Sequence, residues 1–379
     1  MREVYLDNAA TTKVRPEIAE AMAKAMVENY GNPSSIYKAA QRAATAIAAA
    51  RQQVADLIGA SPKEIIFTGG GSEGDNMLIK GVAHAKVKKG RHIITTQVEH
   101  HAVLHTCEEL AKEGFEITYL PVDEFGRVTA AQVEAALRDD TILVSVMYAN
   151  NEIGTIQPIR EIGAVCRQNG VLFHTDAVQA AGHLPINVKE DQIDMLSLSA
   201  HKFNGPKGIG VLYAKIGVFL TNLIEGGGQE RGKRAGTENL PAIVGMAAAL
   251  EEACALQKER SIYVTKLRDQ LIDGLKKISG ALLNGDETRR LPGNVNFCFP
   301  DTEAEGLLLL LDNKGICASS GSACTSGFLD PSHVLLAIGR DPQTARGSLR
   351  LTLDYENTPE EVETIIEAVT DTVRILRGC

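Results

Sequence analysis

Short apolar segments alternate with helical patterns from residue 64 to residue 213, and this alternation restricts the chain to few folds. Most neighbouring apolar segments are joined by a stretch with apolar residues at helical spacing. Such a rhythm is typical of the α/β class, in which a mainly parallel sheet is covered by helices. The expected strands are 64–68, 92–96, 116–120, 141–147, 171–175, 194–199 and 209–213, and the expected helices between them are 73–86, 102–113, 129–138 and 159–168.

Two further helices can be placed from the residues at their starts. Ser34 or Ser35 is a suitable cap for a helix whose apolar stripe begins at Ile36. Towards the other end of the chain, Thr358 and Glu361 have the spacing of a capping box, and an apolar stripe follows them. We therefore expect one helix to start near residue 36 and the last helix to start near residue 359.

The pattern changes after a long helical region at about 241–278, and this change indicates a second domain. Three expected strands then mix with helices in a way that is typical of the α+β class. We expect a large α/β domain at residues 15–257. We expect a smaller α+β domain made of residues 1–14 and 258–379. The three expected strands of the smaller domain are 294–299, 315–318 and 348–353.

Length and composition fit a soluble protein of two domains. The chain has 379 residues, of which 44% are hydrophobic and 23% charged. The N-terminal residues contain no apolar signal core, and the longest aliphatic run, 307–311, is too short to cross a bilayer. We therefore expect a cytoplasmic protein without membrane contact. The net charge is −9, and the basic cluster at 231–234 is too small for a nucleic-acid groove, so no direct contact with nucleic acid is expected.

The cysteines and histidines do not form a metal-binding or disulfide pattern. The seven cysteines are an odd number and contain no CxxC pair, which argues against a disulfide framework and against a zinc ribbon. His101 and His105 would share a helix face beside His100, but no HExxH motif surrounds them. No resident metal is expected.

A lysine and an aspartate lie at the ends of two expected strands. The stretch 196–210, LSLSAHKFNGPKGIG, ends a strand near Lys202 and then turns through glycine and proline, while Asp176 follows the strand 171–175. Partial burial lowers the pKa of a lysine and makes its amine a nucleophile towards carbonyls. Pyridoxal phosphate needs such an amine for its aldehyde and a carboxylate for its ring nitrogen. A single lysine at a strand end is more often a solvated cap, but Asp176, Gln179 and a glycine-rich turn upstream favour the cofactor site.

The glycine-rich turn is GGGSEGDN, residues 69–76, between an expected strand and an expected helix. Free N–H groups and the dipole at a helix N-terminus bind phosphate. The segment 69–74 also matches GxGxxG, and Glu99 follows 25 residues later, so an NAD-dependent oxidoreductase is a remote alternative. That alternative assigns no role to Lys202 or Asp176.

Three more segments have residues suited to chemistry. His100 follows the end of the expected strand 92–96. An imidazole at this position can stack on a flat cofactor and move protons near neutral pH. Cys324 lies in ASSGSACTSG, whose polar and glycine residues predict an exposed loop with a reactive thiol. Arg346 and Arg350 follow it, and either could hold a carboxylate by paired hydrogen bonds.

The motifs HTDAVQA, SLSAHKFNGPKGIG, RAGTEN and SSGSAC together resemble the NifS/IscS group of cysteine desulfurases. The resemblance runs from LDNAATT, residues 6–12, nearly to Cys379, and the four motifs occur in the family's order. It implies a fold type I enzyme that depends on pyridoxal phosphate. The segment SSGSAC followed by TSGFLDPSHVL resembles the subgroup with a long catalytic loop.

The resemblance also implies a role for each matching residue. Lys202 would form the Schiff base with the cofactor, Asp176 would pair with the ring nitrogen, and Cys324 would become a persulfide. No metal of the enzyme's own is implied, since Cys324 would contact an iron–sulfur cluster only during transfer. The other implied contacts are Gln179 with the phenolate oxygen, His100 stacked on the ring, Gly71, Ser72, Ser199 and His201 with the phosphate, Thr237 with the phosphate of a second subunit, and Asn151 and Arg350 with the substrate's carboxylate.

The implied reaction converts L-cysteine to L-alanine in a homodimer. The sulfur passes to an iron–sulfur scaffold or another acceptor protein, for cluster or thio-cofactor assembly. A selenocysteine lyase or a cysteine sulfinate desulfinase, which would use the same cofactor and residues, is the alternative. Open points are the acceptor, the preference for cysteine over selenocysteine, the role of Tyr37 where many relatives have histidine, and any part played by Cys317 or Cys379. The chain also ends at Cys379 without the longer tail that some relatives use for docking.

Overall fold

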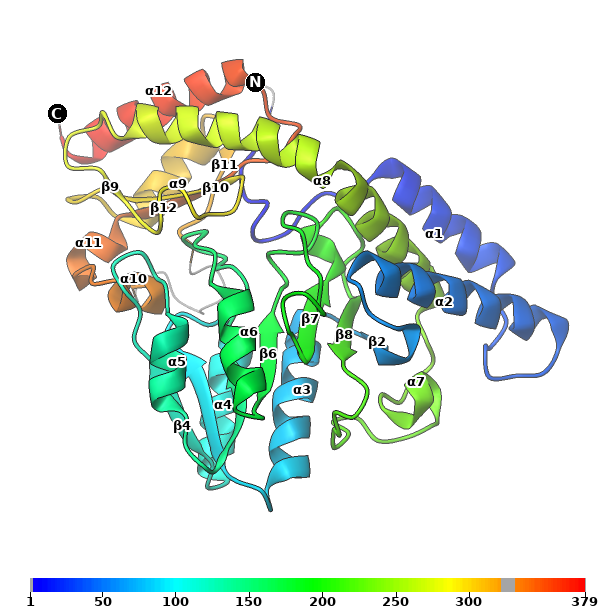
Figure 1. The fold of residues 1–379 in the computed structure, drawn as a ribbon. Helices are drawn as coiled ribbons and strands as arrows, with labels where there is room; N and C mark the ends of the chain where they lie inside the picture. The colour runs from blue at the N-terminus through cyan, green and yellow to red at the C-terminus, as the bar shows by residue number, and fades with distance from the viewer. Residues whose placement is uncertain (1–2, 322–330, 379) are drawn as a thin grey trace.

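The structure is a computed structural model that describes residues 3–321 and 331–378. Its large part is built on a seven-stranded sheet (Figure 1). The strands are β2 (Ile65–Thr68), β3 (His92–Thr96), β4 (Glu116–Leu120), β5 (Thr141–Ser145), β6 (Leu172–Asp176), β7 (Met195–Ser199) and β8 (Gly210–Ala214). All seven lie where the sequence predicts strands.

The strand order in this sheet is β2-β8-β7-β6-β5-β3-β4, and most neighbours are parallel. Only β8 runs antiparallel to its neighbours β2 and β7. The link between β7 and β8, residues 200–209, is too short for the helical crossover that a parallel pair requires. The prediction of a mainly parallel sheet is confirmed.

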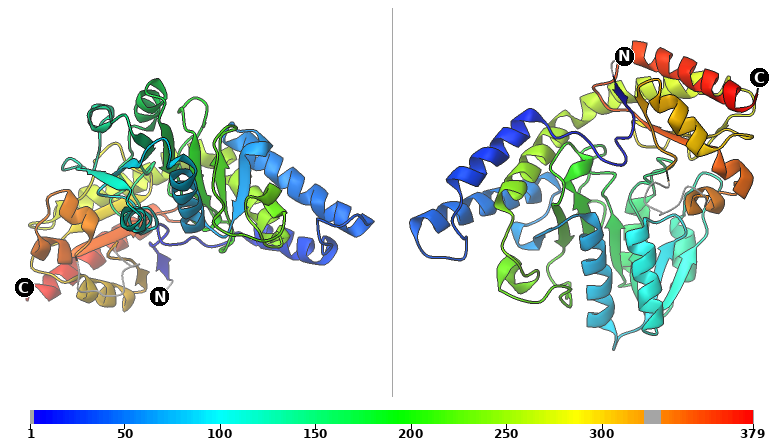
Figure 2. Two further views of the ribbon diagram at one scale, coloured as in Figure 1. Left: turned by 90° about the horizontal axis from the view of Figure 1, so that it is seen from below. Right: turned by 180° about the vertical axis from the view of Figure 1, so that it is seen from behind.

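Helices cover both faces of this sheet. The helices α3 (Gly71–Lys86) and α4 (His101–Lys112) pack on one face, which is in front in the right-hand view of Figure 2. The other face packs against helices from both the start and the middle of the chain. These are α1 (Pro16–Glu28), α2 (Lys38–Leu57), α5 (Ala130–Ala136), α6 (Ile159–Gln168) and α8 (Leu240–Leu275), and the short α7 (Gln229–Gly232) precedes α8.

The start of α2 differs from the sequence prediction. The helix begins at Lys38 after Tyr37, which makes no side-chain cap, and Ile36 is 91% exposed. Both serines belong instead to the preceding turn: the N–H of Ser34 donates to the side chain of Asn32, and the N–H of Ser35 donates to its carbonyl. The predicted cap and the first residue of the predicted stripe are therefore wrong, while the later stripe residues are buried.

The smaller part combines an antiparallel sheet with helices around its own hydrophobic core. Its sheet has the order β12-β10-β9, and a short parallel pair joins β1 to β11. The elements are β1 (Val4–Tyr5), β9 (Leu282–Leu283), β10 (Asn294–Cys298), β11 (Ile316–Cys317), β12 (Ser348–Thr352), α9 (Ala304–Asp312), α10 (His333–Ala337), α11 (Pro342–Arg346) and α12 (Pro359–Leu376). The predicted capping box of α12 is confirmed, because Thr358 and Glu361 accept hydrogen bonds from each other's backbone N–H groups.

The helix α8 runs through both parts and joins them. Its buried residues up to Ala253 pack in the core of the large part, and those from Val264 onward pack in the smaller core. By length and composition α8 could cross a membrane, but it packs against α1, α2 and α12 as the core helix of a soluble fold. The proposed domain boundary at 257/258 falls inside this continuous helix and stays a prediction.

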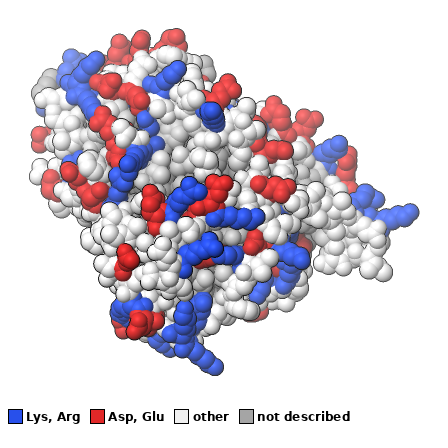
Figure 3. Space-filling view, in the orientation of Figure 1, with Lys and Arg blue, Asp and Glu red and all other residues white. Residues whose placement is uncertain are grey.

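On the face seen in Figure 3, positive and negative side chains are interspersed.

Candidate active site

The ends of β6 and β7 bring the predicted lysine and aspartate to one edge of the sheet. Asp176 is the last residue of β6, and Lys202 ends the 3₁₀ turn Ala200–Lys202 that follows β7. The two strands are parallel neighbours, so their carboxyl ends meet at the same edge. Both residues line a cavity of about 280 Å³.

Nearly all the predicted site residues lie around this cavity. The residues that line it include Lys202, Asp176, Gln179, His100, Gly71, Ser72, Ser199, His201, Asn151 and Arg350. Thr237 lies exposed in the loop before α8 and does not line the cavity of its own chain. Cys324 lies outside the described residues, so its predicted place in an exposed loop stays a prediction.

The amine of Lys202 is held by backbone carbonyls of the N-terminal segment. Its Nζ donates to the carbonyl oxygens of Ala9 at 2.5 Å and Ala10 at 2.8 Å. The Nε2 of Gln179 donates to the same Ala9 oxygen at 2.9 Å. A segment from the start of the chain therefore positions two residues of the predicted cofactor site.

Asp176 is 6% exposed, and its Oδ1 accepts a hydrogen bond from the N–H of Val178 at 2.9 Å. Burial raises the pKa of Asp176 to about 6, and the nearby Asp75 carboxyl adds to the rise. Asp75 lines the same cavity, and burial raises its own pKa to about 7. A cation beside Asp176 would restore its charged form.

The first turn of α3 forms an anion-binding surface on the cavity. Gly70, the N-cap, has a φ of +152° and supplies no side chain, so the helix N-terminus stays open towards the cavity. A Cβ on Gly71 would lie 2.6 Å from a methyl group of Val178, so only glycine fits. The hydroxyl-bearing Ser72 and Ser199 lie at the same place. The N-terminus of this 16-residue helix suits a phosphate.

His100 is the N-cap of α4, and its Nδ1 accepts a hydrogen bond from the N–H of Ala102 at 3.1 Å. Nδ1 is therefore the unprotonated nitrogen, and the neutral ring has its proton on Nε2. Burial lowers the pKa of His100, although the charge of Asp176 opposes the change. A neutral imidazole is thus available on the cavity wall.

Arg350, rather than Arg346, is the arginine of the site. Arg350 is on β12 and 2% exposed, whereas Arg346 ends α11 and is exposed. The Nη1 of Arg350 donates to the carbonyl oxygen of Asn151 at 3.1 Å, and its Nη2 pairs with Asp7 at 2.8 Å. Among the described residues its Nε is buried without a hydrogen-bond partner. The guanidinium can therefore hold a further acceptor such as a carboxylate.

The NAD-binding alternative does not fit this geometry. A dinucleotide fingerprint joins two parallel strands of one βαβ unit. Here the strand before the glycines, β2, lies at an edge of the sheet and pairs only with the antiparallel β8. The strand after α3, β3, is separated from β2 by four strands of the sheet. The segment that matches GxGxxG is therefore not a dinucleotide-binding fingerprint, although its helix N-terminus still suits a phosphate.

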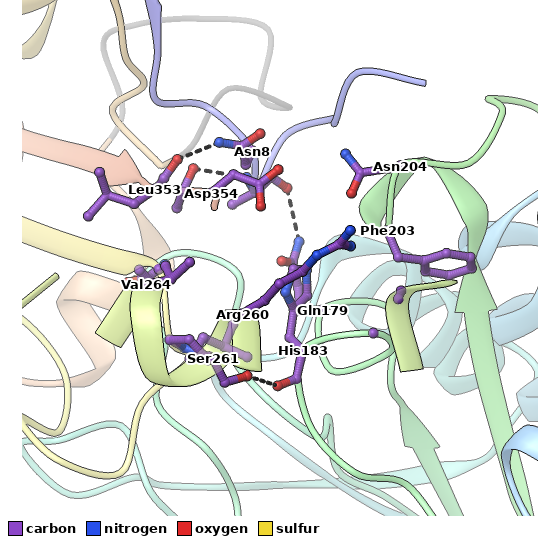
Figure 4. A pocket seen from close by; sticks show the side chains of 18 residues that line it. Asn8, Gln179, His183, Phe203, Asn204, Arg260, Ser261, Val264, Leu353 and Asp354 are labelled. Atoms are coloured by element: carbon purple, nitrogen blue, oxygen red, sulfur yellow. Dashed lines mark hydrogen bonds between the residues drawn. The ribbon is translucent and has the colours of Figure 1, made fainter. Parts of the chain in front are cut away.

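A second cavity lies behind Gln179, between the two parts of the molecule (Figure 4). Its volume is about 60 Å³, enough for a few water molecules and too small for a flat cofactor. Asn8, His183, Arg260 and Asp354 surround it. Figure 4 also shows the hydrogen bonds that hold Asn8 and Gln179 to the strands and loops on either side.

Sequence reasoning missed the contributions of Asp7, Ala9, Ala10 and Asp75 to this site. The first three stand in LDNAATT, which contributes mainly backbone carbonyls and one carboxylate. Alanine carbonyls leave no signal in a sequence. Asp75 stands in the glycine-rich turn, and its place one helical turn below Gly71 could have indicated a buried acid at the cavity.

Comparison with known proteins gives consistent results. Residues 4–365 match the model of the aminotransferase class-V family. The chain is 55% identical over 377 residues to a cysteine desulfurase IscS of Methanosarcina thermophila, covering 100% of this chain and 93% of the relative. It is 49% identical to a putative cysteine desulfurase IscS 1 of Bacillus subtilis, covering 99% of this chain and 100% of the relative.

Solved structures agree with this comparison. A structure of a NifS-like protein superposes with a TM-score of 0.93 at 39% identity, covering 98% of this chain and 100% of that one. A structure described as SspA in complex with cysteine superposes with a TM-score of 0.82 at 38% identity, covering 93% of this chain and 99% of that one. The fold is thus shared with these proteins over at least 93% of the chain.

Proposed function

The chain belongs to the class-V aminotransferase family and, within it, to the cysteine desulfurases, and from this we propose that it converts L-cysteine to L-alanine and passes the sulfur to an acceptor. One observation carries the proposal. A single cavity brings together an amine, a buried aspartate, a neutral imidazole, an open helix N-terminus and an arginine whose Nε has no hydrogen-bond partner among the described residues.

The residues around the cavity fit pyridoxal 5′-phosphate. The N-terminus of α3 with Ser72, Ser199 and His201 would hold the phosphate, and Asp176 would face the ring nitrogen. A protonated ring nitrogen would supply the cation that the buried Asp176 needs. Gln179 would bond the phenolate oxygen and His100 would stack on the ring. When bound, the cofactor withdraws electrons from the substrate's α-carbon.

Lys202 has two proposed tasks. Its amine would hold the cofactor through the cofactor's aldehyde, and when substrate is bound the freed amine would accept and return the α-proton. The carbonyls of Ala9 and Ala10 can hold the freed ammonium, because they already accept hydrogen bonds from Nζ. These acceptors keep the amine within the site during the reaction.

Arg350 and Asn151 are proposed to orient the amino acid. The substrate's carboxylate would bind the guanidinium of Arg350, which is buried and therefore attracts anions more strongly than a surface arginine does. This contact would place the Cα–H bond and the side-chain sulfur on fixed sides of the cavity.

The proposed nucleophile is the thiolate of Cys324. This thiolate would attack the substrate's sulfur, so that an S–S bond forms to Cys324 while the C–S bond of the substrate breaks. The electron pair of the broken C–S bond would go to the substrate carbon, which is then protonated to give L-alanine. Burial raises the pKa of Cys107 and Cys166 to about 12, so these thiols stay protonated at neutral pH. Burial also raises the pKa of Cys254, Cys298 and Cys317, which are therefore poorer nucleophiles.

The assembly and the cellular role complete the proposal. The protein is proposed to be a cytoplasmic homodimer in which Thr237 contacts the phosphate bound by the other subunit. The exposed position of Thr237, outside its own cavity, supports this arrangement. The sulfur is proposed to serve iron–sulfur cluster or thio-cofactor assembly through an acceptor protein.

The experiment is a turnover assay with purified protein and L-cysteine, with and without a thiol reductant. We expect a yellow protein that forms equal amounts of L-alanine and sulfide when reductant is present. Without reductant, we expect one sulfur bound per active site. A colourless protein, or one that forms no alanine, would contradict the proposal.

A further inference from the structure

The segment Asp7–Thr12, here called the N-terminal strap, connects the two parts of the molecule across the cavity. On one side Asn8 Nδ2 donates to the carbonyl of Thr352 at 2.7 Å, and the N–H of Ala9 donates to the hydroxyl of Thr352 at 2.9 Å. On the other side, Gln179 and Lys202 donate to strap carbonyls. Figure 4 shows the hydrogen bonds of Asn8 and Gln179 that belong to these two sets.

The first residue of the strap, Asp7, forms a partly buried ion pair with Arg350, the arginine of the site. Asp7 Oδ1 lies 2.8 Å from Arg350 Nη2, and the two side chains are 22% and 3% exposed. Arg350 lines the cavity, whereas Asp7 is not among its lining residues. Asp7 therefore contacts the guanidinium from outside the cavity wall, and among the described residues the Nε of Arg350 makes no hydrogen bond.

The backbone of Asp7 is fixed. Its carbonyl oxygen accepts hydrogen bonds from the N–H groups of Ala10 and Thr11, and the hydroxyl of Tyr5 also donates to it. Asp7 also bridges to Thr352, two residues from Arg350 on β12. The carboxylate and the guanidinium are thus attached to the same piece of β-structure, which holds the two groups close together.

We propose that Asp7 is a specificity-determining residue, which partly neutralises Arg350 and so weakens the binding of the amino acid's carboxylate. This inference rests on the proposed function, because it takes the ligand of Arg350 to be a carboxylate. Two carboxylates on one guanidinium repel each other, so the second binds less tightly than it would to a free arginine. The physical benefit is faster release of L-alanine, which shares its carboxylate with L-cysteine.

The test compares ligands with and without a carboxylate. L-Alanine and L-alaninamide, in which an uncharged amide replaces the carboxylate, are titrated into the holoenzyme, and the dissociation constants are read from the change in cofactor absorbance. The variant is Asp7→Asn, which keeps a hydrogen-bond acceptor for Arg350 and removes the charge. We expect L-alanine to bind about fivefold more tightly to this variant, and L-alaninamide to bind within about twofold of wild type.

Two variants complete the comparison. Asp7→Glu keeps the charge and should restore the wild-type dissociation constant for L-alanine. Glu356→Gln removes a carboxylate that pairs with Arg15 at the same boundary between the two parts but does not line the cavity. It should leave the dissociation constants of both ligands unchanged. If Asp7→Asn does not fold, Asp7→Ser is used with the same expected outcome.

The outcomes separate the inference from the proposed function. Weaker binding of both ligands to Asp7→Asn, or unchanged binding of L-alanine, would overturn the role of Asp7. If wild type binds L-alanine no better than L-alaninamide, the carboxylate contact itself is wrong and the proposed substrate class fails. A fall in KM for L-cysteine in Asp7→Asn, with kcat unchanged or reduced, would support the inference independently.

Discussion

The Nζ of Lys202 lies 2.5 Å from the carbonyl oxygen of Ala9, although 193 residues separate them in the chain. The lysine leaves the sheet after β7, and the alanine belongs to the strap that comes from the smaller part. The two parts of the molecule therefore meet at the amine, and the position of the strap determines where this amine can move.

Replacing Lys202 by alanine should abolish turnover, because no other described amine lines the cavity to bind the cofactor's aldehyde and move the α-proton. Borohydride should attach the cofactor covalently to wild type and not to the variant, which mass spectrometry of the peptide containing residue 202 can measure. Lys207→Ala, which changes an exposed lysine in the same loop, is the matched control and should stay active. Normal turnover by Lys202→Ala would refute the assignment.

Asp176→Asn should lower kcat/KM by more than about tenfold, which corresponds to ~1.4 kcal/mol of lost transition-state stabilisation. An amide cannot hold the ring nitrogen in its protonated form, whereas the buried carboxylate can. The fold should be retained, as measured by circular dichroism. Asp140→Asn, at an exposed carboxylate paired with Arg138, should leave kcat/KM unchanged. A smaller loss in Asp176→Asn would mean that another group pairs with the nitrogen.

Arg350→Lys should raise KM for L-cysteine at least about tenfold, since an ammonium lacks the forked geometry that matches a carboxylate. The shorter reach would also break the contacts with Asp7 and Asn151. Steady-state kinetics measures the change, and Arg346→Lys serves as the control because Arg346 is exposed and does not line the cavity. An equal effect of both substitutions would show that the arginine of the site has been misassigned.

Glu99 makes the stability of the protein fall as the pH rises. Burial raises the pKa of Glu99 to about 8, so between pH 4.5 and 8 the folded state retains a proton that the unfolded state has lost. Each pH unit in this range therefore favours unfolding, by at most about 1.4 kcal/mol for one group. Buried histidines such as His174, whose pKa is lowered to about 4, act in the opposite direction but only below about pH 6.5.

Glu99→Gln should consequently melt at a higher temperature than wild type at pH 8 and show a smaller difference at pH 5. The glutamine oxygen can still accept from the N–H of Met147 and the hydroxyl of Thr96, which Glu99 Oε1 does now. Thermal unfolding at the two pH values measures the effect, and Glu109→Gln, at an exposed residue of α4, is the control. A variant that is less stable at pH 8 would show that Glu99 is charged in the fold.

The parts of the site that the sequence predicts are those carried by strand ends. Asp176 and Lys202 follow apolar segments, and parallel neighbours must end at one edge, so their meeting could be inferred without coordinates. The capping box at Thr358 is equally local. The start of α2 was mispredicted because Asn32 captures Ser34 in a turn, an alternative that the helical period does not exclude.

Other features depend on contacts between distant segments and were beyond sequence reasoning. The pair Asp7–Arg350 joins residues 343 positions apart, and a single aspartate near the N-terminus is indistinguishable from a solvated one in sequence. The antiparallel β8 illustrates the same limit, because its direction follows from the length of its link to β7 and not from its own residues. Every residue has a backbone carbonyl, so the sequence does not distinguish those of Ala9 and Ala10. They acquire a role only because the fold places them beside Lys202.

Cys324→Ala should separate cofactor chemistry from sulfur transfer. The variant should stay yellow and should still bind L-cysteine, because the residues proposed to hold cofactor and substrate line the cavity and do not include Cys324. It should release neither L-alanine nor sulfide from L-cysteine, since no thiolate attacks the substrate's sulfur. Selenocysteine and cysteine sulfinate should still react, as their leaving groups depart without a nucleophile, and this comparison measures how far the enzyme depends on its thiol.

The same assignment can be checked on wild type after brief exposure to L-cysteine without reductant. Mass spectrometry should find one added sulfur on the peptide that contains Cys324. Cys317→Ala is the matched control and should keep full desulfurase activity, because burial and nearby carboxylates raise the pKa of Cys317 and keep its thiol protonated. Added sulfur on Cys317 or Cys379, or normal L-alanine formation by Cys324→Ala, would place the nucleophile elsewhere in the chain.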